Sequence, residues 1–417
     1  MAETKVNSRV WSILICAWAA IAAAQVIVFG YGMMMPSIME TFGVDTATMG
    51  KIAGVASWFQ VFSLIPLSLL LARVNPKFSV PLVIAFIAIG LFIFGRAVSI
   101  PMLYAGNIIM AIFVNSIATL LVGAKLRGVP PEMYTQVNGI ENFVQPIGQT
   151  IAVLAMAQLL GILGGWRGVY VTVSIILVVA LILYLLFWGN GKRINFGQEA
   201  APQAANAPKE NPLKEVVTSK VVWLTSLAWP GTTIVWIAMF YYWPTYAITT
   251  WGFALPTVGL VLAMIPVFSA IASLTSPVLA KKIGYDKPLI CTWGIILPVC
   301  YYLMLQTNSV PLLCLFSAIT GYGAYCFVPL AFTNVYKIGL SQSAITVATG
   351  VILTFVTVGV GIAGTVLGPL TTSLGLKTTL SIACLTPIWF GVLTLFLPEL
   401  GYKKMMELKR QAEQQSA

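Results

Sequence analysis

Apolar side chains dominate this chain in long runs that are separated by short polar segments. A run of about 20 apolar residues is long enough to cross the core of a bilayer as an α-helix. No strand-like alternation of apolar and polar residues competes with these runs, so the pattern predicts an all-α membrane protein with twelve transmembrane helices. The predicted spans are residues 11–35, 50–72, 78–98, 101–125, 137–163, 167–189, 221–247, 256–280, 287–306, 310–336, 343–372 and 376–398.

One long stretch near the middle of the chain breaks the apolar pattern. Residues 190–220 are rich in Ala, Pro, Gln, Asn and Lys, which is typical of a linker. The predicted parts are an N-terminal six-helix bundle at 1–189, a cytoplasmic linker at 190–220, a C-terminal six-helix bundle at 221–400 and a cytoplasmic tail at 401–417.

The basic residues predict the orientation of the spans. With twelve spans and the N-terminus inside, 19 of the 23 Lys and Arg residues fall in cytoplasmic segments. Cytoplasmic loops of membrane proteins carry such an excess, so we expect both termini in the cytoplasm and a location in the cytoplasmic membrane. The net charge of +11 then reflects topology and contact with anionic lipid headgroups, and we expect no nucleic-acid partner.

Composition and motifs exclude several other classes of protein. The chain is 59% apolar and only 8% charged, whereas a soluble protein is about 25% charged. It contains no His and no CxxC motif, and its six Cys residues lie in apolar spans, so we expect no metal and no disulfide framework. No GxxxxGK[ST] motif for ATP and no catalytic triad is present, so we expect neither an enzyme nor a cofactor.

The two halves of the chain resemble each other at a nearly constant offset. The matched pairs are Pro36 with Pro244, Gly43 with Gly252, Gly50 with Gly259, Arg73 with Lys281, Pro101 with Pro311, Gly148 with Gly359, and Arg167 with Lys377. An ordered series of this kind predicts two parallel repeats that are related by a pseudo-two-fold axis along the membrane normal. Such repeats are typical of secondary transporters that hold their solute between the halves.

Local motifs add a family resemblance. Residues 165–170 read Gly-Trp-Arg-Gly-Val-Tyr, residues 242–246 read Tyr-Trp-Pro-Thr-Tyr, and residues 397–399 read Leu-Pro-Glu. In these motifs and in the repeat, the chain resembles the major facilitator superfamily over essentially its whole length. The resemblance implies transport by alternating access, with helices one, four, seven and ten lining a central cavity.

The chain departs from that family at two places. The loop between helices two and three keeps Arg73 and Lys77 but lacks the usual Asp, whereas its repeat in the second half has Lys281, Lys282 and Asp286. By resemblance, we expect these five residues to belong to cytoplasmic gates. Helix four lacks the Arg that many proton-coupled members carry, so the resemblance does not extend to that style of proton coupling.

Glu141 is the one acidic residue inside a predicted span. An ionisable group in a membrane is costly and marks a functional site by default, so Glu141 is the candidate for proton coupling. The alternative is an ion pair with Lys125 or Arg127 that holds the cytoplasmic end of helix five. The repeat has Ile352 at the matching position, so the fold itself does not require a carboxylate there.

Other polar and aromatic residues are candidates for a solute site. Helix five carries a polar stripe of Asn138, Glu141, Asn142, Gln145 and Gln149, and helix seven carries an aromatic stripe of Trp229, Thr233, Trp236, Phe240 and Trp243. A polar stripe must face protein or water, and an aromatic stripe suits an organic solute or plain helix packing. The predicted cavity residues are Gln25, Asn107, Asn115, Asn142, Gln145, Thr233, Trp236, Phe240, Tyr322 and Tyr325.

Three readings of the function remain open from sequence. The first is a secondary transporter of a small organic solute, functional as a monomer and coupled to a proton or another ion if it is driven. The second is efflux of lipophilic cations or other drugs, which the aromatic residues favour. The third is a membrane sensor that transports nothing, although its linker and tails are too short for an output domain.

Overall fold

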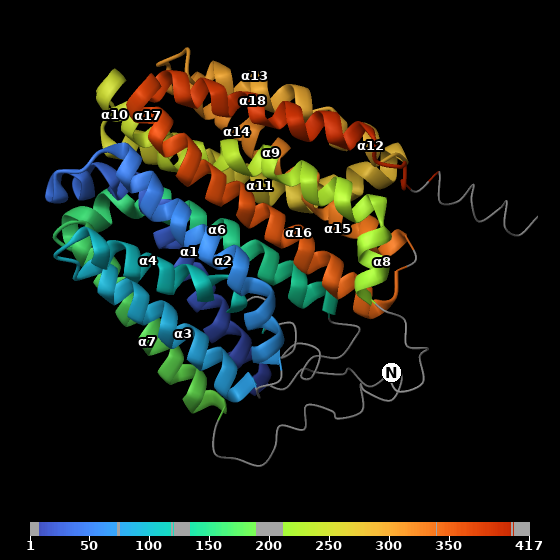
Figure 1. The fold of residues 1–417 in the computed structure, drawn as a ribbon, viewed down its shortest axis with the longest axis horizontal. Coiled ribbons are helices and arrows are strands. Elements are labelled where there is room, and N and C mark those ends of the chain that lie inside the picture. The colour runs from blue at the N-terminus through green and yellow to red at the C-terminus, as the bar shows by residue number, and fades with distance from the viewer. Residues whose placement is uncertain are drawn as a thin grey trace, which may run out of the picture. The chain divides into compact units, whose positions relative to one another are not determined.

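A computed structural model describes residues 8–72, 76–117, 120, 134–188, 212–338, 340–401 and 403. Within these residues the chain forms helices and turns and contains no strand. The chain divides into two compact units, Met1–Lys209 and Glu210–Ala417, at a point that lies in the predicted linker. Figure 1 shows the helices of both units in order along the chain.

The first unit is built from the helices of the first six predicted spans. These are α1 (Ser8–Phe42), α2 (Thr46–Ala72), α3 (Pro76–Gly95), α4 (Ile100–Val114), α6 (Tyr134–Ile162) and α7 (Trp166–Trp188). Asp45 begins α2 by accepting hydrogen bonds from the amide nitrogen (2.9 Å) and the hydroxyl (2.7 Å) of Thr48.

The second unit contains more helical segments because several of its spans are divided. Its segments are α8 (Pro212–Thr218), α9 (Lys220–Tyr241), α10 (Trp243–Trp251), α11 (Leu255–Ile283), α12 (Lys287–Cys291), α13 (Trp293–Leu303), α14 (Val310–Cys326), α15 (Val328–Lys337), α16 (Gln342–Ile362), the π-helix η3 (Ala363–Leu367), α17 (Gly368–Leu374) and α18 (Leu376–Leu395).

Prolines account for three of these divisions. We predicted single spans at 221–247, 310–336 and 343–372, whereas α10, α15 and α17 divide them, and each of these helices has a Pro as its second residue. These are Pro244, Pro329 and Pro369. Proline has no backbone N–H to donate and clashes with the preceding turn, so the helix is interrupted there and starts again.

Nine stretches in the described part of the chain are long and apolar enough to cross a membrane, judged by length and composition. Two shorter apolar helices, Ile100–Val114 and Lys287–Leu303, fall in the fourth and ninth predicted spans. Within the described residues, each predicted span contains one helix or consecutive helical segments, although α4 ends at Val114 and much of the remaining part of the fourth predicted span lies outside those residues. The count of twelve spans stays a prediction.

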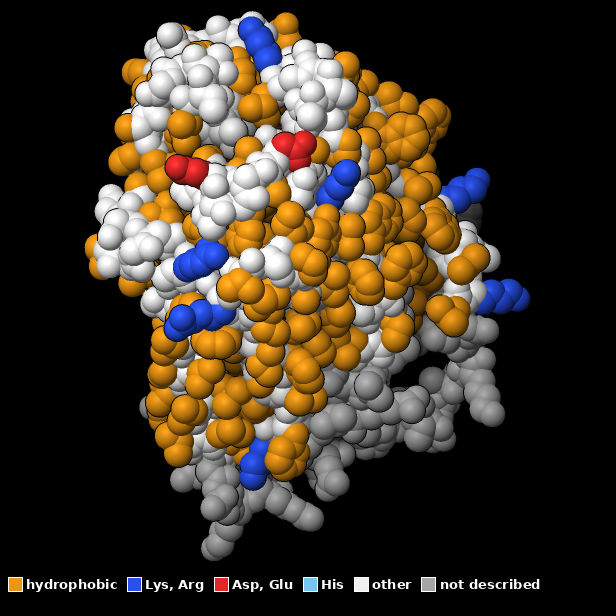
Figure 2. Space-filling model, turned by 60° about the vertical axis from the view of Figure 1, so that its left-hand side comes forward, with side chains coloured by type: hydrophobic (Ala, Val, Ile, Leu, Met, Phe, Trp, Pro, Cys, Tyr) orange, Lys and Arg blue, Asp and Glu red, His pale blue; other side chains and the backbone are white. Residues whose placement is uncertain are grey.

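Hydrophobic side chains also cover the outer surface of the helices. Phe62, Ile295 and Leu186 expose 75%, 74% and 68% of their surface. Figure 2 shows one face on which hydrophobic side chains predominate and Lys and Arg are few and scattered. Soluble proteins rarely expose apolar patches of this extent, so this surface suits contact with lipid.

The same helix pairs pack in both units. In the first unit α1 packs against α6 and α7, α3 packs against α4 and α7, and α2 packs against α4. In the second unit α9 packs against α16 and α18, α13 packs against α14 and α18, and α11 packs against α14. The five pairs correspond one to one under the predicted repeat.

One pair of glycines shows the correspondence at residue level. A Cβ atom placed on Gly148 of α6 would lie 2.9 Å from the carbonyl oxygen of Ala22 and 3.0 Å from Cβ of Gln25 in α1. A Cβ atom on Gly359 of α16 would lie 2.8 Å from Cβ of Thr233 and 3.1 Å from Cα of Pro230 in α9. Only glycine allows two helices to approach this closely, so both units use the same device at the same place.

Candidate functional site

Three aromatic side chains from the predicted set meet between α9 and α14. The ring of Trp236 lies 5.4 Å from the ring of Phe240 and 5.3 Å from the ring of Tyr325, measured between centroids. Trp236 and Phe240 are buried, with 7% and 0% of their surface exposed, and Tyr325 is partly buried. These three residues, the aromatic cluster, offer flat apolar faces and one phenolic hydroxyl.

Thr233 and Tyr322, which were also predicted to line the cavity, make contacts outside the aromatic cluster. Thr233 is buried and donates its hydroxyl to the carbonyl oxygen of Trp229 at 3.3 Å, within its own helix. Tyr322 lies one turn before Tyr325, but its hydroxyl is 2.9 Å from that of Thr275 in α11 and its ring packs on Trp293 in α13. Tyr322 therefore contacts α11 and α13, whereas Tyr325 contacts α9.

Of the two residues predicted in helix four, one is buried in a helix contact and the other is exposed. Asn107 is buried and donates to the carbonyl oxygen of Ile52 in α2 at 3.1 Å, so its amide ties α4 to α2. Asn115 follows the last residue of α4 and is exposed.

Helices α1 and α6, which pack against each other, each carry a glutamine with an enclosed side-chain oxygen. Gln25 of α1 is partly buried, and Gln149 of α6 exposes 2% of its surface. The Oε1 atoms of both side chains are buried and have no hydrogen-bond partner among the described residues. The polar stripe pointed to Gln149, but it was absent from the list of predicted cavity residues.

The remaining predicted residues of helix five lie in α6. Gln145 is partly buried. Glu141 and Asn142 belong to the same helix, but their side chains lie outside the described part of the structure. Glu141 is therefore helical, and both its place in the membrane and its role as the coupling residue stay predictions.

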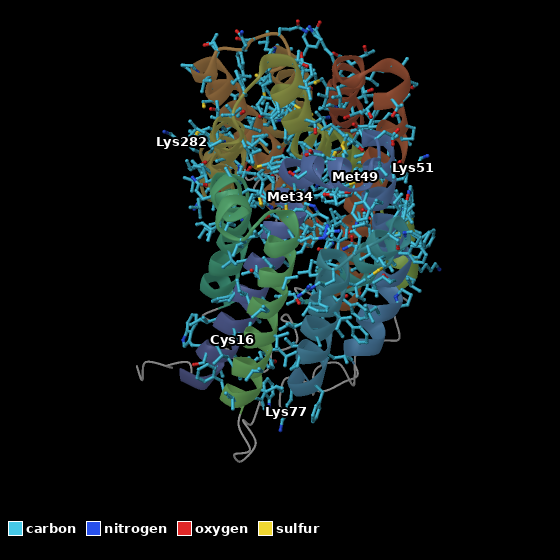
Figure 3. The ribbon with its side chains drawn as sticks, turned by 90° about the vertical axis from the view of Figure 1, so that its left-hand side faces the viewer. Cys16, Met34, Met49, Lys51, Lys77 and Lys282 are labelled. Carbon is cyan, nitrogen blue, oxygen red and sulfur yellow. The ribbon has the colours of Figure 1, made fainter. Side chains whose placement is uncertain are left out.

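The predicted gate residues lie at the ends of helices. Lys77 is the second residue of α3, and its ammonium lies 5.6 Å from the centroid of the Phe78 ring. It lies at the opposite end of the first unit from Lys51 of α2 (Figure 3). Lys281 and Lys282 end α11 and are exposed. Arg73 lies outside the described residues.

Asp286 is the centre of a polar network that joins three separate segments of the second unit. Its carboxylate accepts from Nζ of Lys337, at the end of α15, at 2.6 Å, and the Asp286 side chain is only 6% exposed. Glu399, which follows α18, accepts from the amide nitrogens of Asp286 at 2.9 Å, Lys287 at 3.2 Å and Gly401 at 2.7 Å. The ion pair of Asp286 and the three N–H groups that Glu399 accepts together fix the loop before α12.

Sequence reasoning named Asp286 and Glu399 separately and missed their connection. Both residues stand in motifs that resemble family motifs, which was the available signal. Nothing in the local sequence pairs them with each other or with Lys337, because the residues are 51 to 113 positions apart.

A third carboxylate, that of Glu215, attaches the helical end of the predicted linker to the second unit. Glu215 of α8 accepts from the amide nitrogen of Ser341 at 2.9 Å and from its hydroxyl at 2.8 Å. Ser341 caps the N-terminus of α16, where the helix dipole favours a negative charge. Val216 of α8 is 2% exposed and packs in the hydrophobic cluster of the second unit, so α8 is a docked element of this unit.

Solved structures of other transporters have the same fold. The chain is 15% identical to a bacterial homologue of the human lysosomal transporter Spinster in its inward-facing, unoccupied form, with a TM-score of 0.77 over 94% of this chain and 96% of that one. The inward-facing, occupied form of a bacterial Spinster homologue gives 17% identity and a TM-score of 0.71, with 93% of both chains covered. A variant of the nucleoside transporter NupG gives 12% identity and a TM-score of 0.70, with 93% of this chain and 99% of that one covered.

A comparison with curated proteins gives no match. The sequence model of the Major Facilitator Superfamily matches residues 17–363, which is most of the chain. This match agrees with the helix packing that repeats between the two units. The chain therefore belongs to the major facilitator superfamily and is a multi-pass membrane transporter.

Proposed function

We propose that this transporter is a secondary transporter that moves a small organic solute across the cytoplasmic membrane by alternating access. The observation that carries the proposal is the repetition of five helix packings and one glycine contact in the two units. Two similar bundles are the parts that a rocking mechanism needs, because each bundle can move as a body. The basic residues favour cytoplasmic termini.

A gradient is the proposed source of energy. The sequence contains no ATP-binding motif, and Glu141 is the residue we assign to proton coupling. The same helix, α6, also carries Gln145 and Gln149, whose amides can hydrogen-bond to a solute. Protonation of Glu141 and solute binding would then involve one helix.

Polar and aromatic side chains rather than fixed charges support an organic solute. Apart from Glu141, whose side chain is not described, the acidic side chains in the described part of the first unit are Glu40 and Asp45, which lie near helix ends. The aromatic cluster supplies flat apolar faces in the second unit. Sites for small organic molecules typically combine such faces with a few polar groups. We further propose that the transporter acts as a monomer in contact with anionic lipids.

Flux of solutes into vesicles tests the proposal. Purified protein in proteoliposomes should carry out exchange of a labelled solute, selected by thermal-shift screening, that saturates with concentration. Empty liposomes provide the control. Exchange at the rate of empty liposomes for every solute that stabilises the protein would contradict transport and favour a sensor.

Efflux of lipophilic cations is a second candidate because of the aromatic cluster. Rings of Trp and Tyr bind organic cations through their negative faces. Cells that express the protein should then survive higher concentrations of lipophilic cations, and Trp236→Leu should remove this protection. Equal survival with and without the protein would leave the first proposal as the better one.

A further inference from the structure

The glutamine oxygens of α1 and α6 are buried without a hydrogen-bond partner from the described residues. Gln149 exposes only 2% of its surface, and Oε1 of both Gln25 and Gln149 is enclosed. A buried carbonyl oxygen that accepts no hydrogen bond costs free energy, so proteins seldom retain one without a use. Two such oxygens on adjoining helices indicate that a donor from outside the protein supplies their missing hydrogen bonds.

The packing of the two helices places both glutamines at nearly the same depth. Gly148 lies against Ala22 and Gln25, and eight residues later Met156 lies against Gly30. The helices therefore run parallel with a constant offset, and Gln149 is the neighbour of the glycine that touches Gln25. On this register the two glutamines differ by two residues along the helix axis, or about 3 Å.

The second unit shows that the helix contact does not require these amides. At the equivalent contact, Gly359 packs against Pro230 and Thr233, and the residue after Gly359 is Val360. Thr233 stands in the place of Gln25 and satisfies its hydroxyl within its own helix. The second unit therefore makes the same helix contact without an unpartnered oxygen at these two positions. The fold of the first unit does not require the two glutamines.

We propose that Gln25 and Gln149 form an acceptor site for a solute that donates hydrogen bonds from hydroxyl or N–H groups. This inference rests on the proposed transport function and names the solute class. Amide oxygens accept hydrogen bonds and carry partial negative charge, so they favour polyols, amides and ammonium groups over carboxylates. A bound solute donates hydrogen bonds to these oxygens and so removes the free-energy cost of burying them without a partner. The protein is therefore more stable with the solute bound.

A thermal-shift experiment on the purified full chain tests this site. The probes are mannitol, nicotinamide and ethanolamine, which carry donors, and acetate and betaine, which carry none at neutral pH. The variants are Gln149→Val and Gln25→Thr, the residues that the repeat uses, with exposed Gln306→Val as the matched control.

We expect at least one donor-bearing probe to raise the melting temperature of the unmodified protein and of Gln306→Val. Gln149→Val and Gln25→Thr should weaken its apparent affinity by about tenfold or more, because each removes an acceptor from a buried site. Without probe, Gln149→Val should melt at the same temperature or higher, since it removes a buried polar atom that lacks a partner.

Unchanged affinity in Gln149→Val would overturn the proposal, as would stabilisation by acetate and betaine alone or by no probe. A melting temperature that falls in Gln149→Val while the affinity holds would assign the glutamine to packing. Flux of the same probe separates this inference from transport itself. A probe that is transported equally well by Gln149→Val contradicts the glutamine site only, whereas a glutamine-dependent ligand that is never transported contradicts the proposed function.

Discussion

Two carboxylates at the predicted cytoplasmic end of the second unit act through well-defined partners. Asp286 pairs with Lys337, and Glu399 receives three backbone N–H groups from the loop around Asp286 and from Gly401. These contacts connect the ends of α11, α15 and α18 at one point. A change to one atom of this network should therefore affect the stability of the whole unit.

Asp286→Asn should lower the free energy of unfolding by about 3 kcal/mol, because it leaves the Lys337 ammonium without its counter-charge in a partly buried position. Denaturation in detergent, followed by tryptophan fluorescence, measures the change. The exposed Lys281→Met is the control and should change stability by no more than about 0.5 kcal/mol. Equal effects of the two substitutions would show that the ion pair contributes nothing specific.

A buried tyrosine hydroxyl stabilises the π-helix of the eleventh span. Tyr242, at the junction of α9 and α10, donates to the carbonyl oxygen of Ala363 at 3.1 Å. Tyr242→Phe removes this donor and should cost about 1 kcal/mol of stability. Exposed Tyr302→Phe is the control. A melting temperature for Tyr242→Phe that equals that of the control would contradict a stabilising role for the bond.

At the scale of elements, glycines set how closely helices approach. Within α16, Gly359 touches α9, whereas a Cβ atom on Gly350 would meet nothing within 4 Å. The two glycines lie in one helix and differ in their surroundings, so they form a matched pair.

Gly359→Ala should destabilise the protein by about 1–3 kcal/mol, because its methyl group would press on Thr233 and Pro230. Gly350→Ala should be neutral or stabilising by up to about 1 kcal/mol, since alanine favours the helix. Thermal melting of both variants provides the comparison. If Gly359→Ala melted at or above the temperature of Gly350→Ala, close packing of α9 and α16 would be wrong.

Most helices could be predicted from the sequence because apolar runs report directly on burial in lipid or protein. The divisions of the spans at Tyr242, Phe327 and Gly368 were missed, although the prolines beside them were visible. A Pro inside a membrane helix sometimes only bends it, as Pro36 does not end α1, so its effect depends on the neighbouring helices.

The candidate site was harder to predict than the helices. Trp236 and Phe240 of the aromatic stripe are in contact, as residues four apart on a helix can be, but the different surroundings of Tyr322 and Tyr325 depend on which helices flank α14. Asn107 looked like a ligand for a solute, but its amide ties α4 to α2. Sequence identifies polar residues in spans, and only tertiary contacts show which of them already have partners.

At the scale of the whole molecule, substitution of Glu141 tests how transport is coupled to a source of energy. Glu141→Gln should abolish uptake driven by a pH gradient while sparing solute exchange, because the amide cannot take up and release a proton. Exposed Glu40→Gln is the control and should behave like the unmodified protein. Unchanged driven uptake by Glu141→Gln in proteoliposomes would remove this residue from the mechanism.

Alternating access itself is tested most directly by distances between the two units. Spin labels at Lys77 and Lys282 report on the predicted cytoplasmic ends, and labels at Lys51 and Lys377 report on the predicted outer ends, by double electron–electron resonance in nanodiscs. The account predicts that a solute from the thermal-shift screen shortens one distance while it lengthens the other. Distances that shorten together, or that stay the same on both sides while solute is transported, would contradict it.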